Sequence, residues 1–167
     1  MKLSGAGIIW ICLTVMGFRI SALLKKRTEL LEKTVSLIIN IRVELSYRQE
    51  AIINLLSRIS ELSALQKLDY LSVCTEHVKT GEDFPSAWKK AISESKCSYN
   101  KEEKNKLCSL GEMLGTTDTE SQLTMLRLYE EYMKEFLNKA EKSRREYGRL
   151  SLVMGFLLGF AVFILAL

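Results

Sequence analysis

The 167-residue sequence lacks the motifs by which many enzymes can be recognised. It contains no Gly-x-x-x-x-Gly-Lys-Ser/Thr segment, so the chain carries no phosphate-binding loop of its own. It also has no nucleophile elbow and only one histidine, which excludes a His-rich metal motif. Its carboxylates alternate with Lys and Arg at helical surface positions, as is typical of a solvated helix face. We therefore predict no catalytic residue, no cofactor and no bound metal, and we predict that the protein is not an enzyme.

The few cysteines do not have the spacing of a zinc site. Cys74 and His77 are separated by two residues, but no second close pair accompanies them, and this disfavours zinc. We expect Cys74, Cys97 and Cys108 to lie in the cytosol, where thiols stay reduced. Cys74 and Cys108 are interpreted as small buried apolar residues on helix faces.

Proline occurs only once, at Pro85, and no stretch shows the alternation of β-branched residues that indicates strands. Apolar residues instead recur at steps of three and four through most of the chain, which is the spacing of one helix face. The predicted fold class is therefore all-α, an antiparallel bundle of about six helices.

Long apolar runs occur at both ends of the chain. Residues 150–167 (LSLVMGFLLGFAVFILAL) contain no charge, and a helix of this length, at about 1.5 Å per residue, approaches the ~30 Å core of a bilayer. Residues 3–18 form a second run that is apolar apart from Ser4 and Thr14. We expect a transmembrane helix at each end, with residues 1–24 and 150–167 in the lipid bilayer and residues 25–149 forming a helical bundle.

Basic residues flank both runs on the side that faces the middle of the chain. The positive-inside rule then places the middle in the cytoplasm and both termini outside it. A cleaved signal peptide is the alternative for the first run, but no small-x-small site follows it, so a retained anchor is favoured. The basic residues are Arg19, Lys25, Lys26 and Arg27 after the first run, and Lys142, Arg144, Arg145 and Arg149 before the second.

The formal net charge of +4 comes from these two clusters. Residues 28–138 contain 14 Lys or Arg and 18 Asp or Glu, so the middle of the chain is acidic. Apart from the two clusters, the chain contains no basic stripe with interleaved aromatic residues. Nucleic-acid binding is therefore disfavoured.

Capping patterns and glycines predict where the helices of the middle segment begin and end. Asn100 to Glu103 and Thr117 to Glu120 both have the capping-box pattern, and Pro85 suits a first helical turn. The last helix is expected to run unbroken into the C-terminal span, with a bend at Gly148. The predicted helices cover residues 26–47, 50–60 and 65–79, then a helix from Asp83-Phe84-Pro85, one from Asn100 to Gly115, and one from Thr119 onward.

The turn before the last helix is the most distinctive local sequence. A glycine-stopped helix followed by a capped helix explains it structurally, and Asp118 suits a helix N-terminus because of the helix dipole. Gln122 stands where the apolar stripe would continue, so we expect it to be buried and hydrogen-bonded. Two roles for this turn therefore stay open: it is held to a neighbouring helix by hydrogen bonds, or it contacts a partner. The candidate residues are Leu114, Gly115, Thr117, Asp118, Glu120 and Gln122.

Small residues recur every four positions in the last apolar run, at Ser151, Gly155 and Gly159. This spacing lets a second helix approach closely, and residues 155–159 form a GxxxG motif. The partner helix would be the first span, which offers Gly5 and Gly7, or another subunit. The alternative is that these glycines are simply common in membrane helices.

The layout and several residues resemble the stage III sporulation protein AB family. The family's central pattern, Leu-Gly-x-Thr-Asp-x-Glu-x-Gln, is matched by the six turn candidates named above. An earlier segment, residues 43–47 leading to Ala51 and Ile52, resembles the family's Glu-Ile-x-Tyr segment, with Leu45 in the isoleucine position. The resemblance extends over nearly the whole chain.

This resemblance implies a place in the sporulation machine that links mother cell and forespore in endospore-forming bacteria. It implies a location in the mother-cell membrane around the forespore and a cytosolic domain similar to the F platform domain of type II secretion and type IV pilus systems. Such platforms engage a secretion-type ATPase, here the AA protein of the sporulation operon, together with other membrane subunits.

Secretion platforms carry two such domains, whereas this chain has one, so we expect a homo-oligomer. A two-span regulatory or signal-transmitting subunit is the alternative function. It is disfavoured because the tails predicted to lie outside the cytoplasm are too short to sense a signal there.

Overall fold

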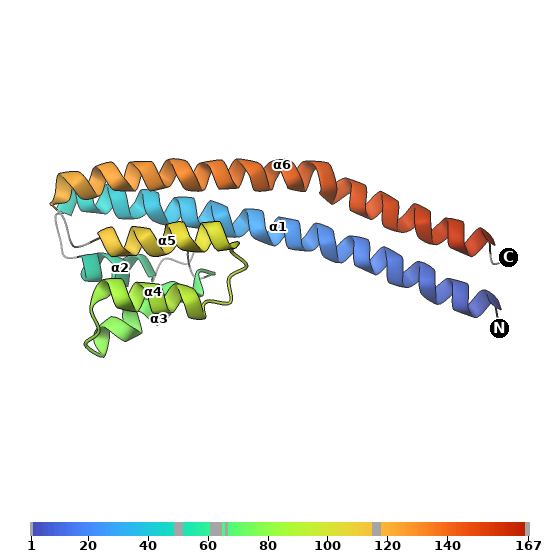
Figure 1. Cartoon of the computed structure of the whole chain (residues 1–167), viewed down its shortest axis with the longest axis horizontal. Helices are drawn as coiled ribbons and strands as arrows, with labels where there is room; N and C mark the ends of the chain where they lie inside the picture. Colours follow the sequence, from blue (N-terminus) through green and yellow to red (C-terminus); the bar gives the residue numbers. More distant parts are fainter. Residues whose placement is uncertain (1, 49–51, 61–64, 66, 115–117, 166–167) are drawn as a thin grey trace. The chain divides into compact units, whose positions relative to one another are not determined.

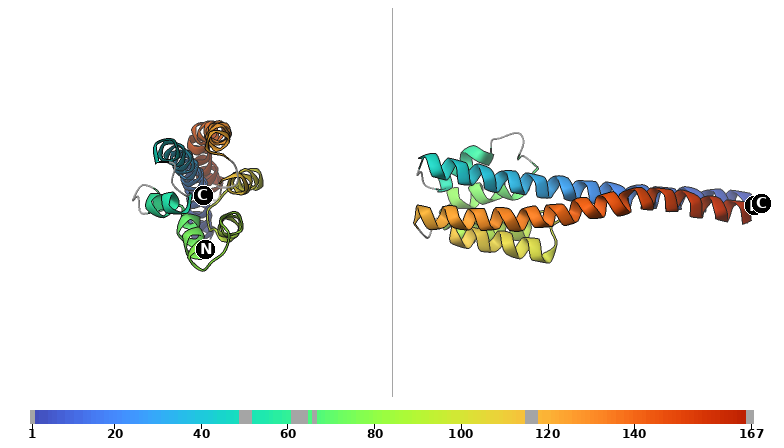
Figure 2. Two further views of the ribbon diagram at one scale, coloured as in Figure 1. Left: turned by 90° about the vertical axis from the view of Figure 1, so that its left-hand side faces the viewer. Right: turned by 90° about the horizontal axis from the view of Figure 1, so that it is seen from above.

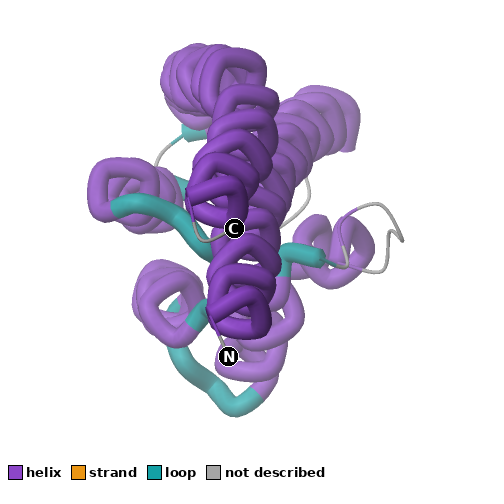
Figure 3. The backbone as a smooth tube through the Cα atoms, turned by 90° about the vertical axis from the view of Figure 1, so that its right-hand side faces the viewer, coloured by secondary structure: helices purple, strands orange, loops and turns teal. Residues whose placement is uncertain are grey.

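The computed structural model describes residues 2–48, 52–60, 65, 67–114 and 118–165. The described residues form helices and connecting loops, and none of them is in a strand (Figure 3). The all-α prediction with about six helices is therefore confirmed. The helices are α1 (Lys2–Arg48), α2 (Ile52–Ser60), α3 (Asp69–Lys79), α4 (Phe84–Glu94), α5 (Lys101–Met113) and α6 (Thr119–Leu165).

The chain forms two compact units. Unit 1 contains Met1–Glu29 and Asn138–Leu167, and unit 2 contains Leu30–Leu137. The two longest helices, α1 and α6, each contribute to both units. The predicted domain limits at residues 24 and 150 stay a prediction, because compactness of the chain does not locate a membrane.

Unit 2 is a bundle of three tiers of helices. Its parts of α1 and α6 form one tier, α2 and α5 lie beneath them, and α3 and α4 form the tier on the far side (Figures 1 and 2). The apolar stripes expected from the sequence face inward between these tiers. Fully buried core side chains include Leu31, Leu37, Ile38, Ile41, Leu55, Tyr70, Trp88, Ile92, Leu107, Leu126 and Met133.

Two of the predicted helix starts are confirmed in atomic detail. At α5 the Asn100 side chain accepts from the backbone N–H of Glu103, and the Glu103 carboxylate accepts from the backbone N–H of Asn100, both at 2.7 Å. This reciprocal pair is the capping box that the sequence indicated. At α4 the Asp83 carboxylate accepts from Ser86 N–H at 3.1 Å, and Pro85 lies in the first turn.

One other predicted helix start is wrong by a few residues, and at another the predicted start holds but the capping residue differs. Helix α3 begins at Asp69 rather than at residue 65. Leu65 and Leu68 are buried as their spacing predicted, but a turn holds them, with Leu68 N–H donating to Leu65 C=O at 2.9 Å. Helix α6 begins at Thr119 as predicted, but its capping side chain is Asp118, which accepts from Ser121 N–H at 2.9 Å, one position later than the capping box placed it.

The α3–α4 connection follows the glycine signal at residue 81. Gly81 has a φ of +97°, and its N–H donates to Val78 C=O while Glu82 N–H donates to His77 C=O. These two bonds form a Schellman motif, which needs a residue of left-handed conformation at this position. Glycine adopts that conformation without the clash that a Cβ would cause.

An aromatic cluster fills the centre of unit 2. The Trp88 ring lies edge-on to Tyr70 and tilted against Phe84, with ring centroids 5.5 and 5.7 Å apart. The buried Trp88 Nε1–H donates to Leu107 C=O of α5 at 2.7 Å. The Tyr99 hydroxyl lies 2.6 Å from the Thr34 hydroxyl of α1. The large buried aromatic area is a strong source of core stability, and the hydrogen bonds of Trp88 and Tyr99 tie the α4–α5 segment together and to α1.

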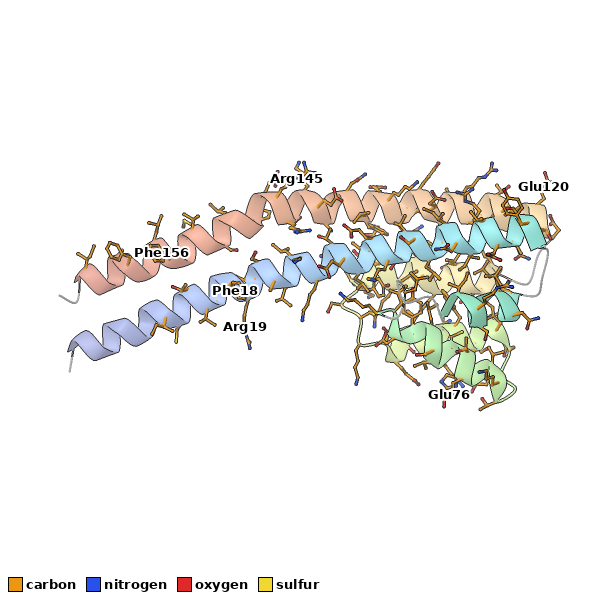
Figure 4. The ribbon with its side chains drawn as sticks, turned by 180° about the vertical axis from the view of Figure 1, so that it is seen from behind. Phe18, Arg19, Glu76, Glu120, Arg145 and Phe156 are labelled. Carbon is orange, nitrogen blue, oxygen red and sulfur yellow. The ribbon has the colours of Figure 1, made fainter. Side chains whose placement is uncertain are left out.

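Unit 1 consists of two antiparallel helical segments that lie side by side, with the terminal ends of α1 and α6 at the same end (Figures 1 and 3). Within it, α6 changes direction just beyond Arg145 (Figure 4), close to the bend expected at Gly148. Over the described residues, no helix is both long and apolar enough to cross a membrane. The transmembrane helices predicted for residues 1–24 and 150–167 are thus not confirmed and stay a prediction.

Candidate functional site

The candidate turn in unit 2 is centred on Asp118. This carboxylate caps α6 by accepting from Ser121 N–H, while Asp118 C=O accepts from Gln122 N–H at 3.0 Å. Hydrogen bonds from the backbone and side chain of Ser121 hold the pKa of Asp118 below its usual range. Asp118 is therefore a fixed, exposed negative charge at the positive end of the helix dipole.

The other turn candidates divide between core and surface. Leu114 ends α5 and is buried, with its N–H donating to Leu110 C=O at 3.1 Å. Gln122 is 9% exposed, so the burial expected from its stripe position is observed. Glu120 is exposed at the beginning of α6 (Figure 4). Gly115 and Thr117 lie outside the described residues.

A shallow hollow of about 320 Å³ lies on the exposed side of this turn. Asp118 and Glu120 line it together with Ser121, Thr124 and Met125. The last three residues were not among those predicted from the sequence. Ser121 lies three residues after Asp118, Thr124 four residues after Glu120 and Met125 four residues after Ser121, and this helical spacing was the signal that would have identified them. The hollow presents two carboxylates and two hydroxyls beside one thioether.

The second candidate site lies in unit 1 on α6. The Ser151 hydroxyl lies 3.2 Å from Gly148 C=O of its own helix and 3.4 Å from Gly17 C=O of α1. Gly155, one turn further along, is partly exposed. For Gly159 the structure describes the backbone only. Ser151 thus meets the first segment at Gly17, and a contact of the small-residue face with Gly5 and Gly7 stays a prediction.

Several thiol and phenol groups elsewhere in unit 2 are held in their neutral forms. Burial raises the pKa of the Cys74 thiol to about 12. Burial also raises the pKa of the Tyr70 hydroxyl, and the neighbouring Tyr99 adds to that shift. Burial is likewise the main cause of the raised pKa of Cys97 and Cys108. Thiols with a raised pKa are poor nucleophiles at neutral pH, so these groups are structural. Cys108 is only partly buried, which corrects the prediction of burial for this residue.

His77 lies among carboxylates on the surface of unit 2. Its Nδ1 is 3.6 Å from Glu82 and its Nε2 is 3.9 Å from Glu94. Lys90 donates to the same Glu82 carboxylate at 2.6 Å. Within the part of the chain that the structure describes, no three His, Cys, Asp or Glu side chains are grouped so as to hold a metal ion. The arrangement around His77 is a surface polar network that links α3 to α4, and Lys90 with Glu82 forms its ion pair.

The described geometry therefore contains a capped turn with an acidic hollow, a helix pair with a close serine–glycine approach, and a packed aromatic core. A search of curated proteins and a search of solved structures each returned no match. A family profile described as stage III sporulation protein AB matches residues 2–167, which is nearly the whole chain. The protein belongs to the stage III sporulation protein AB family.

Proposed function

We propose that this protein is a non-enzymatic platform subunit of a transenvelope sporulation complex. In this proposal unit 1 anchors the chain in the mother-cell membrane around the forespore, and unit 2 lies in the cytoplasm. Unit 2 engages a secretion-type ATPase, the AA protein of the sporulation operon, and other membrane subunits complete the complex. Family membership supports the link to sporulation.

The observation that carries the anchoring part of the proposal is the exposed apolar surface of unit 1. Of the large apolar side chains that the structure describes as exposed, all but Val43, Tyr47 and Leu128 belong to unit 1. Exposed apolar surface of this extent is characteristic of a membrane or protein contact. The exposed residues of unit 1 are Ile11, Val15, Met16, Phe18, Ile20 and Leu23 of α1, and Tyr147, Leu150, Val153, Met154, Phe156, Leu157, Leu158, Phe160 and Ile164 of α6.

Anchoring is tested directly by flotation of the full chain with phospholipid vesicles. We expect the protein to float with the vesicles and to stay with them at high pH in carbonate, because apolar burial in lipid does not depend on ion pairs. Recovery in the soluble fraction would contradict the anchoring. Protease treatment of right-side-out vesicles then tests the topology, because a cytoplasmic unit 2 is protected in them.

The hollow beside Asp118 supports the ATPase part of the proposal. An acidic surface fixed on a rigid helix end suits a basic surface of a partner, and such complementarity mainly sets specificity and association rate. The small residues Ser151, Gly155 and Gly159 would serve helix packing in the membrane, with the first segment, which Ser151 meets at Gly17, or with another subunit. The chain supplies no phosphate-binding loop, so ATP hydrolysis would belong to the partner.

The structure provides a matched pair of variants for the ATPase contact. Asp83 and Asp118 both cap a helix by accepting from the backbone N–H three residues ahead, and both are exposed. Asp83→Ala and Asp118→Ala thus remove the same kind of helix cap. We expect titration of the full chain with the purified ATPase to show saturable binding that Asp118→Ala weakens and Asp83→Ala preserves.

Equal loss of binding in both variants would point to a general effect of lost capping, and would contradict a contact at the turn. Absence of saturable binding by the wild-type chain, measured both in detergent and in membranes, would contradict engagement of the ATPase. Gln122→Ala, measured alongside, tests the buried side of the turn. Its effect is expected on stability rather than on binding, because this side chain is almost inaccessible.

A second candidate function is a two-span regulatory subunit, and the continuity of α6 favours it. This helix runs over 47 residues and contributes to both units without a described break. A regulator should change its conformation when its partner changes state, whereas a platform should not. Distance measurements between spin labels within unit 2, with and without the ATPase and nucleotide, distinguish the two.

A further inference from the structure

Unit 1 contains an apolar groove between its two helical segments. The groove has a volume of about 520 Å³ and is lined by Ile20 and Leu24 of α1 and by Tyr147, Leu150 and Met154 of α6, with two serines. Tyr147, Leu150 and Met154 remain 56%, 53% and 47% exposed. The groove offers almost no hydrogen-bonding group to a ligand, so its natural occupant is an apolar chain rather than a peptide backbone.

The groove has a defined direction within unit 1. Ser151 approaches Gly17, and a Cβ placed on Gly148 would lie 3.7 Å from the Ser21 hydroxyl. Since the two segments are antiparallel, Leu24 lies toward the Tyr147 end of the groove and Met154 lies toward the terminal end. An occupant would therefore have one end near residues 24 and 147 and the other near residues 20 and 154.

Positive charge gathers at the Leu24 end. Residues 19–29 and 141–149 together contain eight Lys or Arg and three Glu. The glutamates form ion pairs along their own helices, Lys25 with Glu29, Lys142 with Glu146 and Arg145 with Glu141, at 3.5–3.9 Å. The net charge of these two segments is therefore positive.

Two arginines are best placed to bring this positive charge to a group bound at the end of the groove. Arg27 follows Leu24 by three residues and so lies on the same face of α1. Arg144 precedes Tyr147 of the groove lining by three residues and so lies on the same face of α6, with its Cγ 4.0 Å from the position of a Cβ on Gly148. Arg145, in contrast, projects from the side of α6 away from α1 (Figure 4).

We propose that this groove binds an acyl chain of an anionic phospholipid, whose phosphate meets Arg27 and Arg144. The apolar lining accounts for the chain, and guanidinium groups bind phosphate through charge-assisted hydrogen bonds. A zwitterionic lipid would fill the groove equally well but would gain less from the net positive charge. This proposal rests on the membrane anchoring proposed above and adds selectivity for the lipid headgroup at one site.

The test uses a photo-crosslinking residue in the full chain. Tyr147→p-benzoylphenylalanine places the probe in the groove lining with little change of shape. The protein is reconstituted into nanodiscs that contain equal amounts of phosphatidylcholine and phosphatidylglycerol, irradiated, and analysed by mass spectrometry. The same probe in place of Tyr47, an 83% exposed residue of unit 2, is the position control.

We expect the adduct at residue 147 to be enriched in phosphatidylglycerol over phosphatidylcholine, and the control position to show no such preference. Each basic residue near an anionic lipid contributes about 1 kcal/mol, or roughly a fivefold preference. Arg27→Gln with Arg144→Gln should therefore bring the two lipids to near-equal yield. Lys96→Gln with Lys101→Gln removes the same charge from exposed positions of unit 2 and should leave the preference unchanged.

Three results would overturn the lipid site. Equal yields of the two lipids at residue 147 in the wild-type background would show lipid contact without selectivity, and anchoring would stand. Crosslinking to a second copy of the chain would show that the groove is an interface between copies. A protein that fails to float with vesicles would refute the anchoring itself, and the lipid site with it.

Discussion

Trp88 of α4 and Gly111 of α5 are in direct contact, and the indole occupies the space that a side chain at residue 111 would need. A Cβ added to Gly111 would lie within 2.7 Å of the Trp88 Nε1 and closer still to its ring carbons. The same ring nitrogen donates to Leu107 C=O, one turn earlier in α5. The absence of a side chain at Gly111 is therefore what lets the two helices approach and the indole find its acceptor.

Gly111→Ala should destabilise unit 2. The added methyl group would displace the indole or separate the helices, and overpacking of this kind costs about 1–3 kcal/mol. Guanidinium unfolding of the full chain in mild detergent, followed by circular dichroism, measures the change.

Gly148→Ala is the matched control for this substitution. Its Cβ would meet the Ser21 hydroxyl at 3.7 Å, an ordinary contact, and alanine is favoured over glycine within a helix by up to about 1 kcal/mol. A Gly111→Ala protein that is as stable as wild type would contradict the close packing of Trp88.

Much of the fold was predictable because local signals agreed with the tertiary structure. The Asn100 capping box, Asp83 before the first turn of α4, and the glycine after α3 each act over a few residues, so the sequence alone identifies them. The start of α3 was misplaced because Leu65 and Leu68 continue the apolar periodicity outside the helix. The apolar periodicity therefore indicated which residues are buried, but it did not show that they belong to the helix.

The contacts that shape the candidate sites were less predictable. The approach of Ser151 to Gly17 joins residues 134 positions apart, and no local pattern encodes such a register. The apolar groove likewise arises from two segments at opposite ends of the chain. At the α6 turn, the spacing of the apolar stripe predicted the burial of Gln122. The identity of the capping residue was not predicted, because it depends on the hydrogen bond that Asp118 makes with Ser121.

Gly81→Ala should destabilise the α3–α4 connection through the backbone alone. The φ of +97° disfavours any residue with a Cβ, while no atom lies within 4 Å of the position where that Cβ would stand. We expect a loss of about 1–2 kcal/mol, the cost of a left-handed conformation for alanine. Gly81→Asn should lose less than Gly81→Ala, since asparagine tolerates this region better. Equal stability of the wild-type and alanine proteins in thermal unfolding would contradict the Schellman motif.

A double-mutant cycle should detect coupling between Arg42 of α1 and Glu130 of α6. The Arg42 Nε donates to Glu130 at 3.1 Å, and Lys134 donates to the same carboxylate, which is only 8% exposed. Burial opposes ionisation, but the hydrogen bond from Lys134 and the charge of Arg42 outweigh it and lower the pKa of Glu130. Arg42→Met, Glu130→Gln and the double variant should give a coupling of about 1 kcal/mol.

The matched cycle uses Lys89 and Glu112, a 3.3 Å pair whose side chains are both more than half exposed. Exposed pairs couple weakly, so this cycle should give a smaller value that vanishes in high salt. Equal coupling in the two cycles would show that the burial of Glu130 does not strengthen its ion pair.

Asp69 should make the stability of unit 2 sensitive to acid. Its carboxylate accepts from the Ser95 hydroxyl at 2.6 Å, from Lys96 N–H at 2.9 Å and from the Cys97 thiol at 3.2 Å, so it ties the start of α3 to the α4–α5 loop. Burial raises the pKa of this carboxyl, but the hydrogen bonds, of which that from Ser95 is the strongest, lower it overall from 3.8.

Since the pKa is lower in the folded protein, the stabilisation by Asp69 is complete above its ordinary value of 3.8 and is lost as the pH falls through the folded value. Asp69→Asn should therefore cost about 1–3 kcal/mol at neutral pH, because the hydrogen bonds from Ser95, Lys96 and Cys97 lose their ionised acceptor. The difference between variant and wild type should shrink below pH 3.8. Glu76→Gln removes a carboxylate from an exposed position of the same helix, and it should leave both the stability and its pH dependence nearly unchanged. An Asp69→Asn protein that loses the same free energy of unfolding at every pH would show that the link between α3 and the loop does not depend on the charge of Asp69.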